Sequence, residues 1–232
     1  MAIDPEPSDE ALTRFLPQAR DSLRDLFGRL DPSFGSIWSQ HVGRLLGRDQ
    51  LDERTRFLVL TSQYTVTRRP EQLEENLGAA LSAGVDAAEL LEIILQAYVY
   101  MGPWVVAEAC RVYESVLTSR GEVPPDLPKQ RRDVSRRDLD EERATWSSAD
   151  AADGRIDELL ETYGWEAISN GLRLRPGHHI NMLDTLDALD PDFLKTWLDA
   201  VYEGMYGRGI VDDRTRLLCV VGATLALGET HQ

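Results

Sequence analysis

Two segments of this sequence begin in nearly the same way, and this internal repeat constrains the fold more than any other feature. Residues 51–60 read LDERTRFLVL, and residues 211–220, which lie 160 positions later, read VDDRTRLLCV. A further match lies upstream, where residues 30–34 (LDPSF) correspond to residues 189–193 (LDPDF). Repeated segments indicate repeated supersecondary units. The chain is therefore predicted to contain two related units.

Apolar residues recur every three or four positions through most of the chain, which is the period of an amphipathic helix. The most apolar segment spans residues 90–99, and Gly102 and Pro103 are predicted to end its helix. The sequence has no alternating pattern with the turn residues of β-hairpins. These observations predict an all-α protein.

Short polar residues and glycines mark the expected helix ends. Asp52 and Asp86 stand where an N-cap is needed, and Glu89, three residues after Asp86, predicts a capping box. Gly47 and Gly84 are expected to stop the helices that precede them.

Composition excludes several functions. The 232 residues carry a formal net charge of −15, which argues against nucleic acid and anionic membranes as partners. The longest apolar run, residues 217–227, is shorter than the about 20 residues that span a bilayer, and the N-terminus shows no signal-peptide pattern. Cys110 and Cys219 have neither CxxC nor metal-ligand spacing. We therefore predict a cytoplasmic protein and no cysteine metal site.

Residues 121–150 separate the two predicted units. They contain three prolines, a basic cluster from Lys129 to Arg137 and then an acidic segment, which together predict a charged linker. A nucleic-acid-binding arm is the alternative. The predicted organisation is a first unit at residues 1–120, this linker, and a second unit at residues 151–232 that is incomplete at its C-terminal end. Either the natural chain is longer, or another subunit covers the apolar segment 217–227.

The segment LDERTRFLVL (51–60), followed by NLGAALSAGVDAAELLEIILQAYVYMG (76–102), resembles the carboxymuconolactone decarboxylase family. The resemblance covers residues 51–118, and residues 211–232 in part. It implies the helical fold of alkylhydroperoxidase D, in two tandem units, and a homo-oligomer, trimeric or hexameric. It also implies a lyase that acts on a small cyclic or carboxylated metabolite by acid–base chemistry without a cofactor.

Family members of the peroxidase type use a glutamate, two cysteines in CxxC and a histidine. The resemblance places these positions at Phe57, Arg69, Gln72 and Asn76, so all four reactive groups are replaced. Thiol peroxidase chemistry needs a thiolate and a nearby resolving thiol, and it is not expected here. A non-catalytic member that binds a ligand or assembles with partners is the alternative from a different functional class.

Four residues are the candidate acid–base groups. Glu229 and His231 follow the apolar helix of the second unit, where the family places reactive groups, and such a pair can move a proton near neutral pH. A solvated chain end is the simpler alternative. His178 and His179 fall in a predicted loop, residues 173–179, before a helix whose N-terminus would favour neutral imidazole. A polar loop contact is the alternative for them.

Three residues are the candidate substrate-binding groups. Arg69, together with its neighbour Arg68, would face an anion if the first unit keeps a pocket. Tyr98 and Trp104, near the helix break, would form a wall against a ring-shaped ligand. A solvated pair of arginines and core aromatics are the simpler alternatives. Arg54 and Arg214 occupy matching positions beside acidic residues in both copies, which predicts local ion pairs or cap contacts and fits a structural role better than catalysis.

Overall fold

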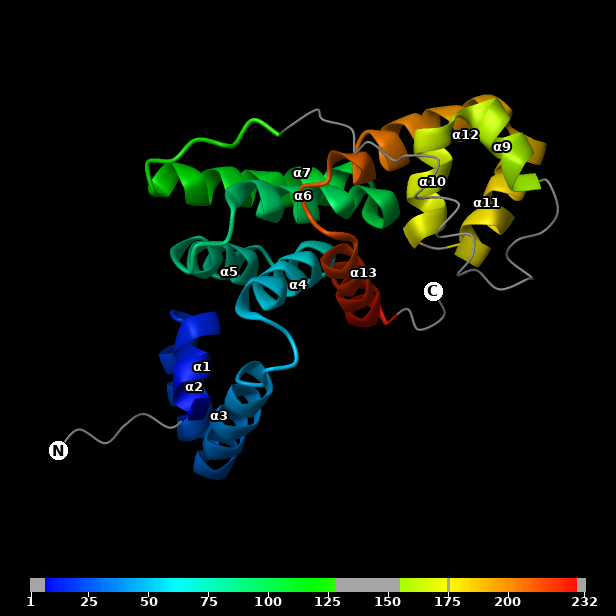
Figure 1. The fold of residues 1–232 in the computed structure, drawn as a ribbon. Helices are drawn as coiled ribbons and strands as arrows, with labels where there is room; N and C mark the ends of the chain where they lie inside the picture. Colours follow the sequence, from blue (N-terminus) through cyan, green and yellow to red (C-terminus); the bar gives the residue numbers. More distant parts are fainter. Residues whose placement is uncertain (1–6, 128–154, 175, 229–232) are drawn as a thin grey trace. The chain divides into compact units, whose positions relative to one another are not determined.

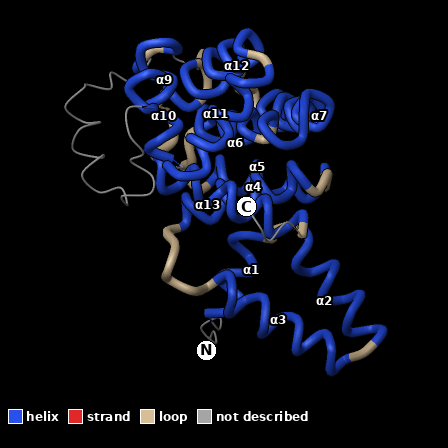
Figure 2. Tube along the Cα trace, turned by 90° about the vertical axis from the view of Figure 1, so that its right-hand side faces the viewer, coloured by secondary structure: helices blue, strands red, loops and turns tan. Residues whose placement is uncertain are grey.

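The computed structural model describes residues 7–127, 155–174 and 176–228, and every regular element among them is a helix (Figures 1 and 2). The prediction of an all-α protein is confirmed for this part of the chain. In order the helices are α1 (Pro7–Phe15), α2 (Ala19–Leu30), α3 (Pro32–Leu46), α4 (Glu53–Val66), α5 (Pro70–Ser82), α6 (Ala87–Gln96), α7 (Tyr98–Ser119), α9 (Arg155–Tyr163), α10 (Trp165–Leu174), α11 (Pro176–Leu189), α12 (Pro191–Trp197), the π-helix η1 (Leu198–Glu203), the 3₁₀-helix η2 (Tyr206–Arg208) and α13 (Asp213–Leu227).

Contacts divide the chain into two compact units. The first combines Met1–Pro125 with Arg214–Gln232, and the second is Asp126–Asp213. Helix α13 therefore belongs to the compact unit built by α1 to α7, although its sequence repeats that of α4. The predicted boundaries group segments by sequence similarity, whereas these units group segments by contact.

The helix ends of the first unit follow the predicted signals. The side chain of Asp52 accepts a hydrogen bond from the backbone N–H of Thr55 at 2.8 Å, and that of Asp86 accepts from the N–H of Ala88 at 2.8 Å. Gly84 follows α5 with φ of +85°, a conformation that glycine adopts without a steric cost. Both N-caps and this helix stop are confirmed.

The capping box predicted at Glu89 is wrong. Both carboxylate oxygens of Glu89 instead accept hydrogen bonds from the Nε of Arg54, at 3.0 and 2.9 Å. A guanidinium is a stronger partner for a carboxylate than a neutral backbone N–H, because both groups are charged. Arg54 thus has a structural role, as predicted, but its partner lies 35 residues away and not in the neighbouring sequence, so the ion pair joins α4 to α6.

The predicted break at Gly102 and Pro103 is a kink within α7. Gly102 has φ of +73° and interrupts the helical backbone, while Pro103 continues the helix after it. The main change of direction comes earlier, between α6 and α7, whose axes are bent by 119°. Within the described residues no single helix is long and apolar enough to cross a membrane.

The predicted loop at residues 173–179 is wrong in the second unit. Helix α10 continues to Leu174 and α11 begins at Pro176, so the backbone of His178 and His179 is helical. Proline is favourable in the first turn of a helix, since its fixed φ suits the helix and its missing N–H needs no partner there. Pro176 thus starts α11 earlier than the apolar spacing indicates.

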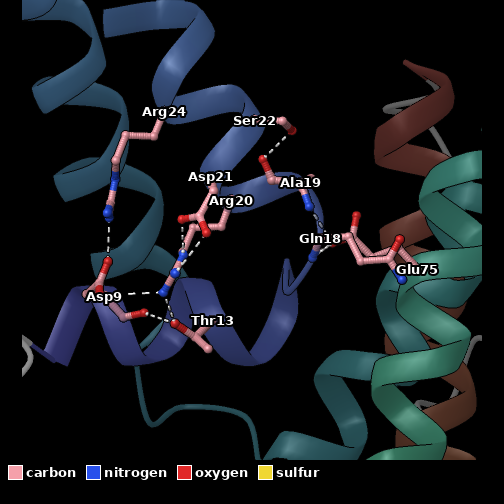
Figure 3. Close-up of polar contacts among 9 residues, drawn as sticks. All are labelled: Asp9, Thr13, Gln18, Ala19, Arg20, Asp21, Ser22, Arg24 and Glu75. Atoms are coloured by element: carbon pink, nitrogen blue, oxygen red, sulfur yellow. Dashed lines mark hydrogen bonds and ion pairs between the residues drawn. The ribbon is translucent and has the colours of Figure 1, made fainter.

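A carboxylate on α5 attaches the N-terminal helices to the rest of the first unit (Figure 3). The Oε1 of Glu75 accepts hydrogen bonds from the backbone N–H groups of Gln18 and Ala19, at 2.6 and 2.8 Å, where α2 begins. These N–H groups lack intrahelical acceptors, and a negative charge is favourable at a helix N-terminus. Nearby, the rings of Phe15 and Phe57 pack at 4.7 Å between centroids, which joins α1 to α4.

Candidate functional site

A small pocket lies at the corner where α4 passes into α5. It encloses about 10 Å³, room for about one water molecule. An organic ring does not fit inside this space, although one small polar group of a larger ligand does. The pocket is lined by Tyr64, Thr65, Arg68, Arg69, Pro70, Leu73, Val105, Glu108, Ala109 and Val112.

Asn76, at the position where the resemblance expects a histidine, lies one helical turn after Leu73 and is not among the residues that line the pocket. Asn76 is buried, and its Nδ2 donates to the carbonyl of Phe57 at 3.2 Å and to the Oγ1 of Thr61 at 2.9 Å. Phe57, at the glutamate position of the resemblance, is itself fully buried. Neither side chain titrates, so these two positions supply no proton donor or base.

Thr65 lines the pocket and carries a buried hydroxyl. The residue is 2% exposed, and its Oγ1 forms no hydrogen bond with any described residue. An unpaired buried hydroxyl is costly, because it has lost water without gaining a partner. A ligand atom or a water molecule in the adjacent space would satisfy it.

Arg68 and Glu108 form an ion pair at the same pocket. The Nε and Nη2 of Arg68 both lie 3.1 Å from the Oε2 of Glu108, which links the end of α4 to α7. Arg68 has φ of +54°, a left-handed conformation that side chains rarely adopt. Both side chains are well exposed, so the pair contributes only about 0–1 kcal/mol.

Arg69 lies beside Arg68 at the start of α5. It is the N-cap residue of that helix, and its side chain caps no backbone N–H. Within the described part of the chain its guanidinium forms no ion pair. The pocket therefore combines two guanidinium groups with the positive end of a helix, an environment that favours an anion.

Tyr64 is the remaining polar residue at this pocket. Burial raises the pKa of its phenol, and the negative charge of Glu75 raises it further. Tyr64 is therefore a neutral hydrogen-bonding group at physiological pH and does not compete with an anion for the arginines.

Two other predicted site residues lie away from the pocket. Neither Tyr98 nor Trp104 is among its lining residues, and Trp104 is 84% exposed. Glu229 and His231 lie outside the described residues, as do the side chains of His178 and His179. Among the three predicted site residues whose side chains the structure describes, Arg69 is the one at the pocket.

A buried charged cluster elsewhere in the first unit escaped sequence reasoning. Arg216 of α13 is 1% exposed, and its guanidinium donates to the carboxylate of Glu92 and to the side-chain carbonyl of Gln96, both at 3.0 Å. The amide of Gln96 also donates to the backbone carbonyl of Arg216 at 3.4 Å. The available signal in the sequence is that Glu92 and Gln96 stand one helical turn apart among the apolar residues of α6.

Helix α13 also contacts α4, the helix whose sequence it repeats. The hydroxyl of Ser62 donates to the carbonyl of Cys219 at 3.0 Å. A Cβ built on Gly222 would lie 2.7 Å from a methyl group of Val59, so the two helices approach closely at this glycine. Cys219 is thus fully buried in a helix interface.

Neither cysteine has the surroundings of a reactive thiol. Cys110 on α7 is half buried, and burial raises its thiol pKa, which disfavours the nucleophilic thiolate. Within the described ranges no three His, Cys, Asp or Glu residues come together in a way that could hold a metal ion.

Comparisons of the chain with models of protein families, with curated proteins and with solved structures found no match.

Proposed function

We propose that this protein binds a small carboxylate at the corner between α4 and α5, and that it performs no acid–base catalysis there. One observation carries the proposal: at this pocket Arg68 already holds a carboxylate, that of Glu108. The side chain of Glu108 stands for the group that a ligand would present.

The surroundings of Arg68 favour a carboxylate over a neutral ligand. Arg69 adds a second positive charge, the N-terminus of α5 adds a partial one, and the buried hydroxyl of Thr65 is available as a donor. The enclosed volume admits about one oxygen atom of the carboxylate, so the rest of the ligand would lie at the pocket mouth beside the two arginines. Since the pair of Arg68 with Glu108 is exposed and weak, a ligand displaces Glu108 at little cost.

The absence of acid–base groups at two key positions supports binding without catalysis. Asn76 is engaged with the carbonyl of Phe57 and the hydroxyl of Thr61, so it neither takes up nor releases a proton. The enzymatic alternative, a cofactor-free lyase resembling carboxymuconolactone decarboxylases, would depend on Glu229, His231, His178 and His179.

The resemblance to that family stays part of the proposal. The order of α4 to α7 follows the segment that carries the resemblance, which supports an alkylhydroperoxidase D-like unit with a second, related segment at α13. Assembly into trimers or hexamers and a cytoplasmic location are further predictions from the sequence.

Titration calorimetry with benzoate and benzamide tests the proposal, because the two probes have similar shapes and only benzoate is charged. We expect the full chain to bind benzoate and to ignore benzamide. Arg68→Asn, whose new side chain tolerates the left-handed backbone, should weaken benzoate binding about tenfold or more. Glu108→Gln should strengthen it several-fold, because the internal competitor loses its charge.

The matched control is Arg111→Gln, which removes an exposed arginine of α7 that does not line the pocket. Its benzoate affinity should equal that of the unchanged protein. Equal binding of both probes, or equal losses in Arg68→Asn and Arg111→Gln, would refute a carboxylate site. Turnover of a lactone substrate by the Arg68→Asn variant would favour the enzymatic alternative.

A further inference from the structure

Helices α4 and α13 meet through reciprocal contacts. Ser62 of α4 contacts residue 219 of α13, and Val59 of α4 contacts residue 222. With the sequence offset of 160 residues, Cys219 matches Val59 and Gly222 matches Ser62. Each position thus contacts the counterpart of the other, which is the signature of a twofold relation. We infer a local twofold axis between α4 and α13.

This axis relates two arginines whose surroundings differ. Arg216 of α13 is buried against α6, where Glu92 and Gln96 accept hydrogen bonds from its guanidinium. Its counterpart on α4 is Arg56, which donates only to backbone carbonyls, those of Leu46 and Leu51, and lies 5.7 Å from the ring of Phe15. No carboxylate of the described residues pairs with Arg56.

A pocket of about 370 Å³ lies beside Arg56, where the twofold axis would place a second helix like α6. Its lining is mostly apolar and includes Leu45, which is well exposed. The full lining is Leu45, Leu46, Arg48, Gln50, Leu51, Arg56, Val59 and Leu60. The space is therefore apolar with a positive group at its wall, which is the counterpart of an apolar helix that carries a carboxylate.

The outer face of α13 also lacks cover, of the kind that α5 and α7 give to the matching face of α4. Val221 and Leu225 are 52% and 61% exposed, whereas their counterparts on α4, Thr61 and Thr65, are buried. Apolar side chains stand exposed on α13 where the matching polar ones on α4 are covered by neighbouring helices. A helix pair that is related by a twofold axis should be covered alike on both sides.

We propose that the α4–α13 pair is a docking surface for a helix of the α6 type, supplied by a partner polypeptide. The partner helix is apolar and carries Glu and Gln four residues apart, as Glu92 and Gln96 are in α6. Its glutamate would pair with Arg56 as Glu92 pairs with Arg216, and its apolar side chains would fill the pocket beside Leu60.

A fluorescent peptide of residues 86–99 with lysines appended for solubility is the probe, and fluorescence anisotropy with the full chain is the measurement. We expect saturable binding that Arg56→Met weakens about tenfold or more, because the peptide glutamate then lacks its partner. A peptide with Glu92→Ala should lose the same factor, and its affinity should no longer respond to Arg56→Met. Arg44→Met, at an exposed arginine of α3 outside the pocket, is the matched control and should bind as the unchanged protein does.

Circular dichroism verifies that the variants remain helical. If Arg56→Met does not fold, Leu60→Glu serves in its place, since a negative charge in the pocket should repel the peptide glutamate. Absence of binding, or binding insensitive to Arg56→Met and Leu60→Glu, would overturn the proposal. Sedimentation that showed self-association lost in Arg56→Met would also overturn it, because a second copy would then occupy the surface.

Discussion

Arg216 and Glu92 lie 124 positions apart in sequence and form an ion pair that is almost completely buried, with 3.0 Å between Nη2 and Oε1. The pair fixes α13 to α6, and Gln96 completes it through a second hydrogen bond from the same guanidinium. Removing two charges from water is costly, so such a pair specifies which surfaces meet more than it adds stability. Together with the contacts of α13 to α4, it places the repeated segment of the sequence within the first compact unit.

We predict that Arg216→Met destabilises the protein by about 3–5 kcal/mol, because Glu92 is left buried without its partner. The double variant Arg216→Met with Glu92→Leu should recover most of this loss, since no uncompensated charge remains. Urea denaturation of both single variants and the double variant measures the coupling. Additive losses in the double variant would contradict the role assigned to the pair.

Close approach of α13 to α4 predicts a large cost at Gly222. A Cβ there would lie 2.7 Å from a methyl group of Val59, a stiff β-branched side chain, so Gly222→Ala should cost about 1–3 kcal/mol. Gly78→Ala on α5 is the control, because its new Cβ meets nothing within 4 Å. That control should stabilise by about 0.5–1 kcal/mol. If denaturation curves showed that both substitutions change the free energy of unfolding in the same direction, the predicted contact would be refuted.

The N-cap of α4 predicts a pH-dependent contribution to stability. Hydrogen bonds from the backbone and hydroxyl of Thr55 lower the pKa of Asp52 in the folded protein. Because the pKa of Asp52 is lower in the folded than in the unfolded state, its ionised carboxylate stabilises the fold at every pH above the unfolded-state pKa of about 3.9. This stability is lost as the pH falls through the lower, folded-state pKa.

Asp52→Ala should therefore cost about 1 kcal/mol at pH 7 and less as the solution is acidified below pH 4. Asp52→Asn keeps an acceptor oxygen without a titrating group, so it separates the cap from the charge. Urea denaturation at several pH values is the measurement. If the difference in free energy of unfolding between Asp52→Ala and the unchanged protein grew on acidification, the predicted pH dependence would be wrong.

The left-handed backbone at Arg68 separates stability from binding. Arg68→Gly removes both the strain at φ of +54° and the guanidinium, so stability should hold or rise by up to about 1 kcal/mol while benzoate binding is lost. Arg69→Gly is the control, because Arg69 has φ of −111° and gains no relief. Thermal unfolding should place Arg69→Gly below the unchanged protein. A marked loss of stability in Arg68→Gly would contradict the claim that the left-handed backbone at Arg68 is strained.

The sequence predicts local structure in this protein better than it predicts tertiary contacts. Asp52, Asp86 and Gly84 act on their own helix ends through contacts a few residues long, which is why their roles were predictable. The sequence predicts a local capping box at Glu89, but its carboxylate instead accepts hydrogen bonds from the guanidinium of Arg54, 35 residues away. Burial of Arg216 could not be predicted at all, because the sequence does not reveal which distant partners meet.

The candidate site was predictable only in part. The sequence predicts that Arg69 and Arg68 face an anion if a pocket is present, and both residues line one. The pairing of Arg68 with Glu108 depends on a contact between the end of α4 and α7 across 40 residues, which no local sequence pattern predicts. The sequence also does not predict that the buried hydroxyl of Thr65 lacks a hydrogen-bond partner, since this depends on how the neighbouring helices pack around it.

A crystal structure of the full chain with benzoate tests the central claim, carboxylate binding at Arg68, most directly. The account predicts the benzoate carboxylate within hydrogen-bond distance of the Arg68 guanidinium and the Thr65 hydroxyl, with Glu108 displaced from its present position 3.1 Å from Arg68. Benzoate bound elsewhere, with the pair of Arg68 and Glu108 intact, would contradict it.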